Sequence, residues 1–223
     1  MMSTIDKKAH ISVPNAVRAG RGNLGCICLF LVVIFCSCTS THPSLSRIPE
    51  DAVVLAFGDS LTSGVGAPNG SSYPEILETL IHRKVIRSGI SGETSGEGLV
   101  RLPRELAAYK PRLVLLCLGG NDLLRKMDPE KTAQNIKRMI QIIRDSGAEV
   151  MLIGVPAPGF ILSTAPFYKK ISKDMNTPLE GSLLADILAD RTLKADPIHP
   201  NEEGYRLLAQ GIAAFLRKAG AVS

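Results

Sequence analysis

Short apolar runs alternate with segments of helical periodicity from about residue 50 to the end of the chain. Each run is short and is bordered by turn residues, which indicates a strand that is covered on both faces. Strands separated by helices predict a parallel sheet with helices on both of its faces. We therefore expect one α/β domain with about five parallel strands. The apolar runs span residues 52–57, 84–90, 112–118 and 149–155.

Capping residues mark where several of the helices begin. Asp128 followed by Pro129 is typical of a helix start, and Asn201 precedes two glutamates at the start of the last helix. The helical periodicity also predicts helices over 73–83 and 98–109. Beyond Pro156 the periodicity is weaker, and there the sequence predicts helices over 167–175 and 183–189 and a short edge strand over 178–181.

The first 37 residues have the features of a secretory leader. Four basic residues precede an apolar run over 24–36, which is shorter than the about 20 residues that a membrane span needs. The run ends in Phe35-Cys36-Ser37-Cys38, which resembles the lipobox of bacterial lipoproteins. We expect a signal peptide over 1–37, an acylated Cys38 at the mature N-terminus, a tether over 38–50 and the folded domain over 51–221.

A lipid on Cys38 would attach the protein to a membrane of the bacterial cell envelope, on the periplasmic side. Thr39 stands where an aspartate would favour the inner membrane, so by the same resemblance we expect the outer membrane. Cleavage by an ordinary signal peptidase near Ser40 and retention as an uncleaved anchor are the alternatives.

Charge and cysteine content exclude several other classes of protein. The net charge is +5, and residues 1–37 carry three of these five charges, so the domain has no basic footprint for nucleic acid. Cys117 is the one cysteine beyond the leader region, and its apolar neighbours predict a buried residue rather than a reactive thiol.

Four short blocks of glycine and polar residues follow the predicted strands or precede the last helix. In a doubly wound sheet, loops at the carboxyl ends of strands meet at one rim, so we expect the four blocks to form one site. The blocks are Gly58-Asp59-Ser60-Leu61, Ser91-Gly92-Glu93-Thr94-Ser95, Gly119-Gly120-Asn121-Asp122 and Asp196-Pro197-Ile198-His199-Pro200.

The residue types in these blocks suit acyl transfer. A serine hydroxyl becomes a good nucleophile when an imidazole takes its proton and a carboxylate orients that imidazole. Ser60, His199 and Asp196 supply these groups. Pro197 disfavours a helix here, so we expect the last two to lie on a stiff loop.

The same chemistry requires hydrogen-bond donors for the oxyanion of the tetrahedral intermediate. Gly92 allows close approach of the backbone, and Asn121 adds a neutral amide donor. Each of these residues, taken alone, is also typical of a turn or a helix cap. Their combination in four ordered blocks favours the catalytic interpretation.

Through these four blocks the sequence resembles the SGNH (GDSL) hydrolase superfamily over roughly residues 52–218, and looks closest to its periplasmic acyl thioesterase, arylesterase and lysophospholipase branch. The resemblance implies a three-layer flavodoxin-like fold and hydrolysis of a small acyl ester or thioester. Ser60 would be the nucleophile, His199 the base and Asp196 its orienting acid. The oxyanion hole would consist of the Ser60 and Gly92 backbone amides and the Asn121 side chain.

The sequence departs from that family at Pro197, where a glycine is usual, which leaves the path of this loop open. The resemblance is weak between Pro156 and Ala195, a kind of segment that often sets acyl-chain preference. No cofactor, metal or protein partner is expected. A carbohydrate O-acetyl esterase is the alternative activity, and an inert ligand-binding lipoprotein is a more distant one.

Two further enzyme classes fit the sequence poorly. The glycine-rich stretch over 64–70 begins too late after its strand for a dinucleotide fingerprint, and Pro68 interrupts the turn that the fingerprint requires. A metal hydrolase would need paired ligands, and the domain side of the chain has only His42, His82 and His199 without such spacing.

Overall fold

The computed structural model describes residues 44–159 and 161–223. The predicted signal peptide, over residues 1–37, and the predicted lipidation site, Cys38, lie outside the described residues. Among those that are described, no helix has the length and apolarity needed to cross a bilayer.

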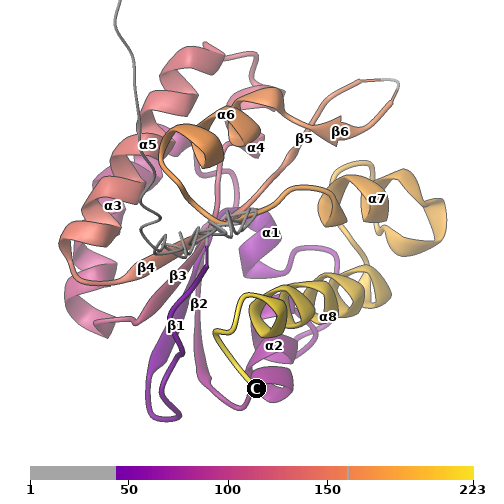
Figure 1. Ribbon diagram of the computed structural model, residues 1–223. Helices are drawn as coiled ribbons and strands as arrows, with labels where there is room; N and C mark the ends of the chain where they lie inside the picture. The colour runs from indigo at the N-terminus through magenta and orange to yellow at the C-terminus, as the bar shows by residue number, and fades with distance from the viewer. Residues whose placement is uncertain (1–43, 160) are drawn as a thin grey trace, which may run out of the picture. The chain divides into compact units, whose positions relative to one another are not determined.

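A five-stranded parallel sheet forms the centre of the domain, in the order β2-β1-β3-β4-β7 (Figure 1). This confirms the predicted α/β fold with parallel strands. The side chains on both faces of β1 and β3 are buried, which explains why the sequence of each strand is a continuous apolar run. The strands are β1 (Val53–Gly58), β2 (Lys84–Gly89), β3 (Leu113–Cys117), β4 (Glu149–Ile153) and β7 (Leu179–Glu180).

Helices cover the sheet on both sides (Figure 1). On one side α3 (Ser95–Tyr109) packs against α5 (Pro129–Asp145), which also contacts α6 (Pro166–Asp174). On the other side α8 (Glu202–Lys218) packs against α2 (Tyr73–Ile81) and α7 (Leu183–Ala189). The result is the expected three-layer arrangement.

Several short elements lie near the ends of the strands and were not predicted. The 2-residue strands β5 and β6 pair antiparallel with each other, outside the main sheet. These elements are α1 (Ser60–Ser63), α4 (Gly120–Leu124), β5 (Pro156–Ala157), β6 (Ser163–Thr164) and the 3-10 helix η1 (Arg191–Leu193).

Helix α3 begins at Ser95, three residues before the predicted start at residue 98. The reason is a capping box: the Thr94 side chain accepts from the Glu97 amide, and the Glu97 carboxylate accepts from the Thr94 amide. The Gly/Ser-rich composition of this stretch therefore conceals the first helical turn.

The packed part of the chain includes residues that precede position 51. Leu45 and Ile48 are buried in the core, and the Ile48 amide donates to the Ala221 carbonyl at 2.8 Å.

Cys117 is fully buried in β3, as predicted, and burial raises the pKa of its thiol well above the ordinary value. This thiol is therefore kept neutral and is not a candidate nucleophile.

Candidate active site

The four blocks meet at the topological switch point of the sheet. From β1 the chain proceeds to β2 on one side, and β3 then pairs with β1 on the other side. Gly58 lies in register with Gly89 of β2 and with Cys117 of β3, so the three strands end at the same level. At such a point a crevice forms outside the ends of the strands. In this protein the blocks that follow β1, β2 and β3 lie at that crevice.

Ser60 is the first residue of the short helix α1, which begins where β1 ends. The Asp59 carboxylate caps this helix by accepting from the Leu61 amide at 3.0 Å. A Cβ at Gly58 would lie 2.2 Å from the Thr62 hydroxyl oxygen, so the strand can turn this sharply only with glycine there. The local sequence thus places the half-buried Ser60 hydroxyl at the rim of the sheet.

The structure brings Ser60, His199 and Asp196 into one hydrogen-bonded chain. His199 Nε2 lies 2.9 Å from Ser60 Oγ, and His199 Nδ1 lies 2.7 Å from Asp196 Oδ2. With the proton on Nδ1, Nε2 is the acceptor that faces the serine hydroxyl. The imidazole can therefore take the proton of Ser60 while the carboxylate fixes its orientation.

Asp196 also organises the loop on which both residues lie. Its Oδ1 accepts from the Ile198 and His199 amides at 2.8 and 2.9 Å, and the loop does not form a helix, as predicted. Partial burial raises the pKa of the Asp196 carboxyl, but the hydrogen bonds from His199 and from the loop amides outweigh that effect and lower it. The carboxylate is therefore ionised at neutral pH. Pro197, which left the path of this loop open in the sequence, does not prevent these hydrogen bonds.

The three residues predicted to form an oxyanion hole, Ser60, Gly92 and Asn121, follow the ends of β1, β2 and β3. Gly92 has a φ of 81°, which favours glycine. Within residues 44–159 and 161–223, the Ser60 and Gly92 amides have no protein acceptor. Asn121 Nδ2 donates to the Glu93 carbonyl at 3.0 Å and makes a longer contact of 3.3 Å with Asp59 Oδ2.

Asp59 is a buried carboxyl group at the base of this site. Burial, together with the nearby Glu93 and Asp122 carboxylates, raises the pKa of Asp59 from 3.8 to about 7, although the hydrogen bond from the Leu61 amide opposes the shift. The folded protein therefore holds this proton more tightly than the unfolded chain does. It follows that this group makes the fold less stable as the pH rises from about 4 to about 7.

Replacing Asp59 with asparagine is expected to remove this pH dependence. The free energy of unfolding of Asp59→Asn relative to the wild type should rise by about 2–4 kcal/mol between pH 4.5 and pH 8 and then level off. Urea denaturation at a series of pH values measures this difference. Asp145→Asn, at an exposed carboxyl on α5, is the control for the general effect of removing one negative charge. A constant difference for Asp59→Asn across this range would contradict the expected titration.

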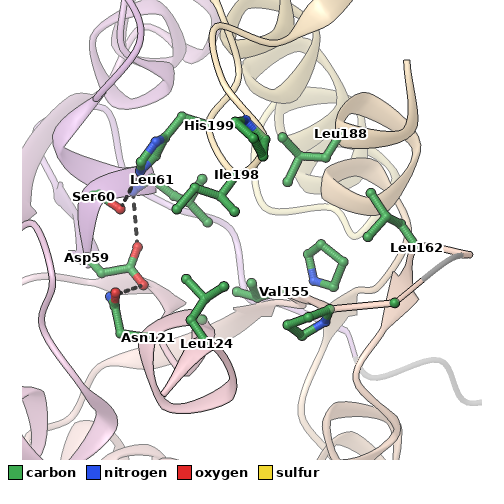
Figure 2. A pocket seen from close by; sticks show the side chains of 15 residues that line it. Asp59, Ser60, Leu61, Asn121, Leu124, Val155, Leu162, Leu188, Ile198 and His199 are labelled. Atoms are coloured by element: carbon green, nitrogen blue, oxygen red, sulfur yellow. Dashed lines mark hydrogen bonds between the residues drawn. The ribbon is translucent and has the colours of Figure 1, made fainter. Parts of the chain in front are cut away.

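An apolar cavity of about 230 Å³ opens beside the serine (Figure 2). The polar side chains of Ser60, Asn121 and His199 lie along one side of it, and the remaining sides are apolar. Sequence patterns gave little information on the lining from Pro158, Gly159 and Leu162, because these residues lie in the connection between the short strands β5 and β6. The apolar side chains are Leu61, Leu124, Val155, Pro156, Pro158, Leu162, Leu188, Pro197 and Ile198.

Asp122 supports the site in a way that the sequence reasoning missed. Its buried carboxylate accepts from the Ser95 amide at 2.8 Å and from the Ser95 and Thr132 hydroxyls. It thereby joins the short helix α4, which carries Asn121, to the first turns of α3 and α5. Its place directly after Asn121 is the one sequence signal that pointed to it.

Across the described part of the chain, no group of three or more metal-binding side chains occurs.

A parallel α/β sheet with a serine hydroxyl 2.9 Å from an imidazole nitrogen at its switch point is typical of a serine hydrolase. Residues 56–207 match the model of the GDSL-like lipase/acylhydrolase family. The chain belongs to that family and is an ester or thioester hydrolase with the SGNH fold.

Named relatives agree with this assignment. The chain is 31% identical over 172 residues to thioesterase 1/protease 1/lysophospholipase L1 of Escherichia coli (strain K12), which covers 74% of this chain and 83% of the relative. It is 32% identical over 201 residues to an arylesterase of Vibrio mimicus, covering 85% and 97%. The crystal structure of the psychrotrophic esterase EstA from Pseudoalteromonas sp. superposes with a TM-score of 0.68 at 27% identity, covering 75% and 98%.

Proposed function

We propose that this protein hydrolyses carboxylic esters or thioesters of acyl chains through a Ser60-His199-Asp196 triad and an acyl-enzyme intermediate. The observation that carries the proposal is the continuous hydrogen-bonded chain from Asp196 through His199 to Ser60, at the mouth of an apolar cavity. The thioesterase and arylesterase relatives support the same class of substrate.

The geometry suggests the following sequence of proton transfers. His199 Nε2 takes the hydroxyl proton as Ser60 Oγ attacks the carbonyl carbon, and the carbonyl oxygen becomes an oxyanion that accepts from the Ser60, Gly92 and Asn121 donors. Collapse of the intermediate expels the alcohol or thiol, which takes the proton from His199. A water molecule, deprotonated by His199 in turn, then attacks the carbonyl carbon of the acyl-enzyme. The bond between Ser60 Oγ and the acyl carbon breaks, Ser60 Oγ takes the proton back from His199, and the acid is released.

The cavity favours an acyl chain over an acetylated sugar as the substrate. A sugar would need polar partners, whereas Leu124, Val155, Leu162 and Leu188 present apolar surface to whatever enters. Its volume of about 230 Å³ is below the range of roughly 300–1,000 Å³ that is usual for small-molecule sites, which favours short and medium acyl chains. A carbohydrate O-acetyl esterase is accordingly the second candidate activity.

Rates on a panel of substrates test this proposal. The panel contains nitrophenyl esters of graded chain length, acyl-CoA, lysophospholipid and an acetylated sugar. We expect the highest kcat/KM on short or medium acyl esters or thioesters. A preference for the acetylated sugar would support the second activity, and no turnover of any member would indicate an inert binding protein.

Leu124 offers a test of the acyl site that spares the core, because 44% of the residue is exposed. Leu124→Ser should lower kcat/KM for an octanoyl ester by about threefold to tenfold and leave an acetyl ester unchanged, since only the longer chain gains apolar contact there. Met127→Ser, also exposed and outside the cavity lining, is the matched control. An equal loss on both esters would show that the octanoyl chain does not use this site.

We further propose that the enzyme works at the cell envelope as a lipoprotein. The basic leader, its apolar run and the Ser37-Cys38 pair support this location. Intact-mass analysis of the mature protein from membranes tests it, since an unmodified Cys38 or a mature N-terminus beyond it would exclude the lipid anchor.

A further inference from the structure

We infer that Arg101 is a positioning residue, which acts through Glu93 to hold the Gly92 and Asn121 donors of the oxyanion hole in place. This inference deepens the proposed function and rests on it. Arg101 lies on α3 and belongs to none of the four blocks. The mechanism described above requires donors that are already oriented, since their effect on rate depends on preorganisation.

Glu93 connects both donors. Gly92 directly precedes Glu93 in the chain. The backbone carbonyl of Glu93 accepts a hydrogen bond from Asn121 Nδ2 at 3.0 Å. A displacement of Glu93 would therefore move the Gly92 amide and the Asn121 amide together. The backbone of this loop has two other hydrogen bonds, from the Glu93 amide to the Ile90 carbonyl at 3.1 Å and from Arg125 to the Gly92 carbonyl at 2.8 Å. The Arg125 contact is exposed, so the buried side chain of Glu93 is the part of the loop that is fixed away from solvent.

Arg101 holds the Glu93 side chain with two hydrogen bonds. Its Nε donates to Oε1 at 2.7 Å and its Nη2 to Oε2 at 2.5 Å, in the parallel geometry that is specific to arginine. The side chains of Arg101 and Glu93 are only 9% and 5% exposed. The pair is thus shielded from water, and its geometry is tightly defined.

Arg101 is itself anchored to the strand ends that carry the site. Its guanidinium lies 4.0 Å from the centre of the Phe57 ring, donates to the Gly58 carbonyl at 3.3 Å, and contacts the Ser88 hydroxyl at 2.5 Å. Phe57 and Gly58 end β1, directly before Asp59 and the nucleophile. Arg101 therefore fixes the distance between the loop of Glu93 and the strand that presents Ser60.

A purely structural role is the competing explanation, because a buried ion pair can serve stability alone. Replacing both members of such a pair with apolar side chains often leaves stability unchanged or increases it. The double variant Arg101→Met/Glu93→Leu therefore separates the two roles. It removes both charges and keeps the backbone carbonyl at position 93, but it removes the side-chain clamp on the loop.

We expect this double variant to unfold at a urea midpoint near that of the wild type, with kcat lowered by about 10- to 100-fold and KM within about threefold on the best ester of the panel. Arg101→Lys keeps the charge but not the paired geometry, so it should show a smaller loss of kcat. Arg104→Ala, at a side chain on the same helix that is 78% exposed, should retain full activity. Wild-type kcat in a folded double variant would overturn the inference.

A double-mutant cycle with Asn121→Ala gives a second, independent result. If the pair acts through the oxyanion donors, its removal should cost several-fold less in the Asn121→Ala background than in the wild type, because part of what it positions is already absent. Equal losses of kcat in both backgrounds would show that the pair does not act through the Asn121 donor and would overturn the inference. If the double variant does not fold, the same cycle is measured with Arg101→Lys in its place. Absence of wild-type activity on the whole panel would overturn the proposed function and this inference together, whereas an active wild type with unaffected variants overturns this inference alone.

Discussion

Ser60→Ala is expected to lower kcat by about 10³-fold or more, because the hydroxyl oxygen is the atom that would form the bond to the acyl group. His199→Ala should be similarly severe. Asp196→Ala should be milder if the loop still orients the ring. Steady-state kinetics on a nitrophenyl ester, with circular dichroism to verify the fold, measure these effects.

Ser63→Ala is the matched control for this substitution. Ser63 lies on the same short helix, and its hydroxyl donates to the Ser60 carbonyl at 3.1 Å without contacting His199. Its removal should leave kcat nearly unchanged. A folded Ser60→Ala variant that keeps wild-type turnover would show that the nucleophile lies elsewhere.

Asn121→Ala is expected to lower kcat by about 10²- to 10³-fold with a much smaller change in KM. Its amide would interact with the oxyanion, which exists only in the transition state and the intermediate. The ground-state substrate carbonyl gains little from it, so binding should be almost unaffected. Rates over a range of substrate concentrations separate the two parameters.

The contrary outcome for Asn121→Ala would be a raised KM at unchanged kcat, which would make Asn121 a substrate-binding residue. Asn135→Ala is a suitable control, because that amide donates to the Ser95 hydroxyl and not to the serine site. Loss of activity in both variants would indicate disturbance of α3 rather than loss of an oxyanion donor.

The site concentrates buried carboxyl groups in a small volume. Asp59, Glu93 and Asp122 are each less than 10% exposed, and the first of them has a raised pKa. Such groups lower the stability of a fold unless they are paired, which Arg101 does for Glu93 and hydrogen-bond donors do for Asp122. Asp59→Asn should therefore stabilise the protein at pH 8, whereas it places an amide donor against the Asn121 amide and should reduce activity.

Local sequence was sufficient for most of the elements and for the residues proposed as catalytic. The apolar runs predicted four of the five strands of the sheet and the weaker pattern predicted the edge strand, because these signals depend on burial along one segment. The four blocks likewise predicted Ser60, Gly92, Asn121, Asp196 and His199, since each block marks where a strand ends or a helix begins. The start of α3 was misplaced because glycine and serine outweighed a capping box.

The tertiary structure decided how these residues act together. The contact of Asn121 with Asp59, the anchoring of Glu93 by Arg101, and the cavity wall from Val155 to Leu188 join positions that are distant in the chain. Such contacts depend on strand order and on how α3 packs over the end of β1, and no local periodicity or capping signal encodes either of them. The sequence by itself therefore determined which residues can react, whereas the packing of the sheet and helices determined what orients them and what substrate can reach them.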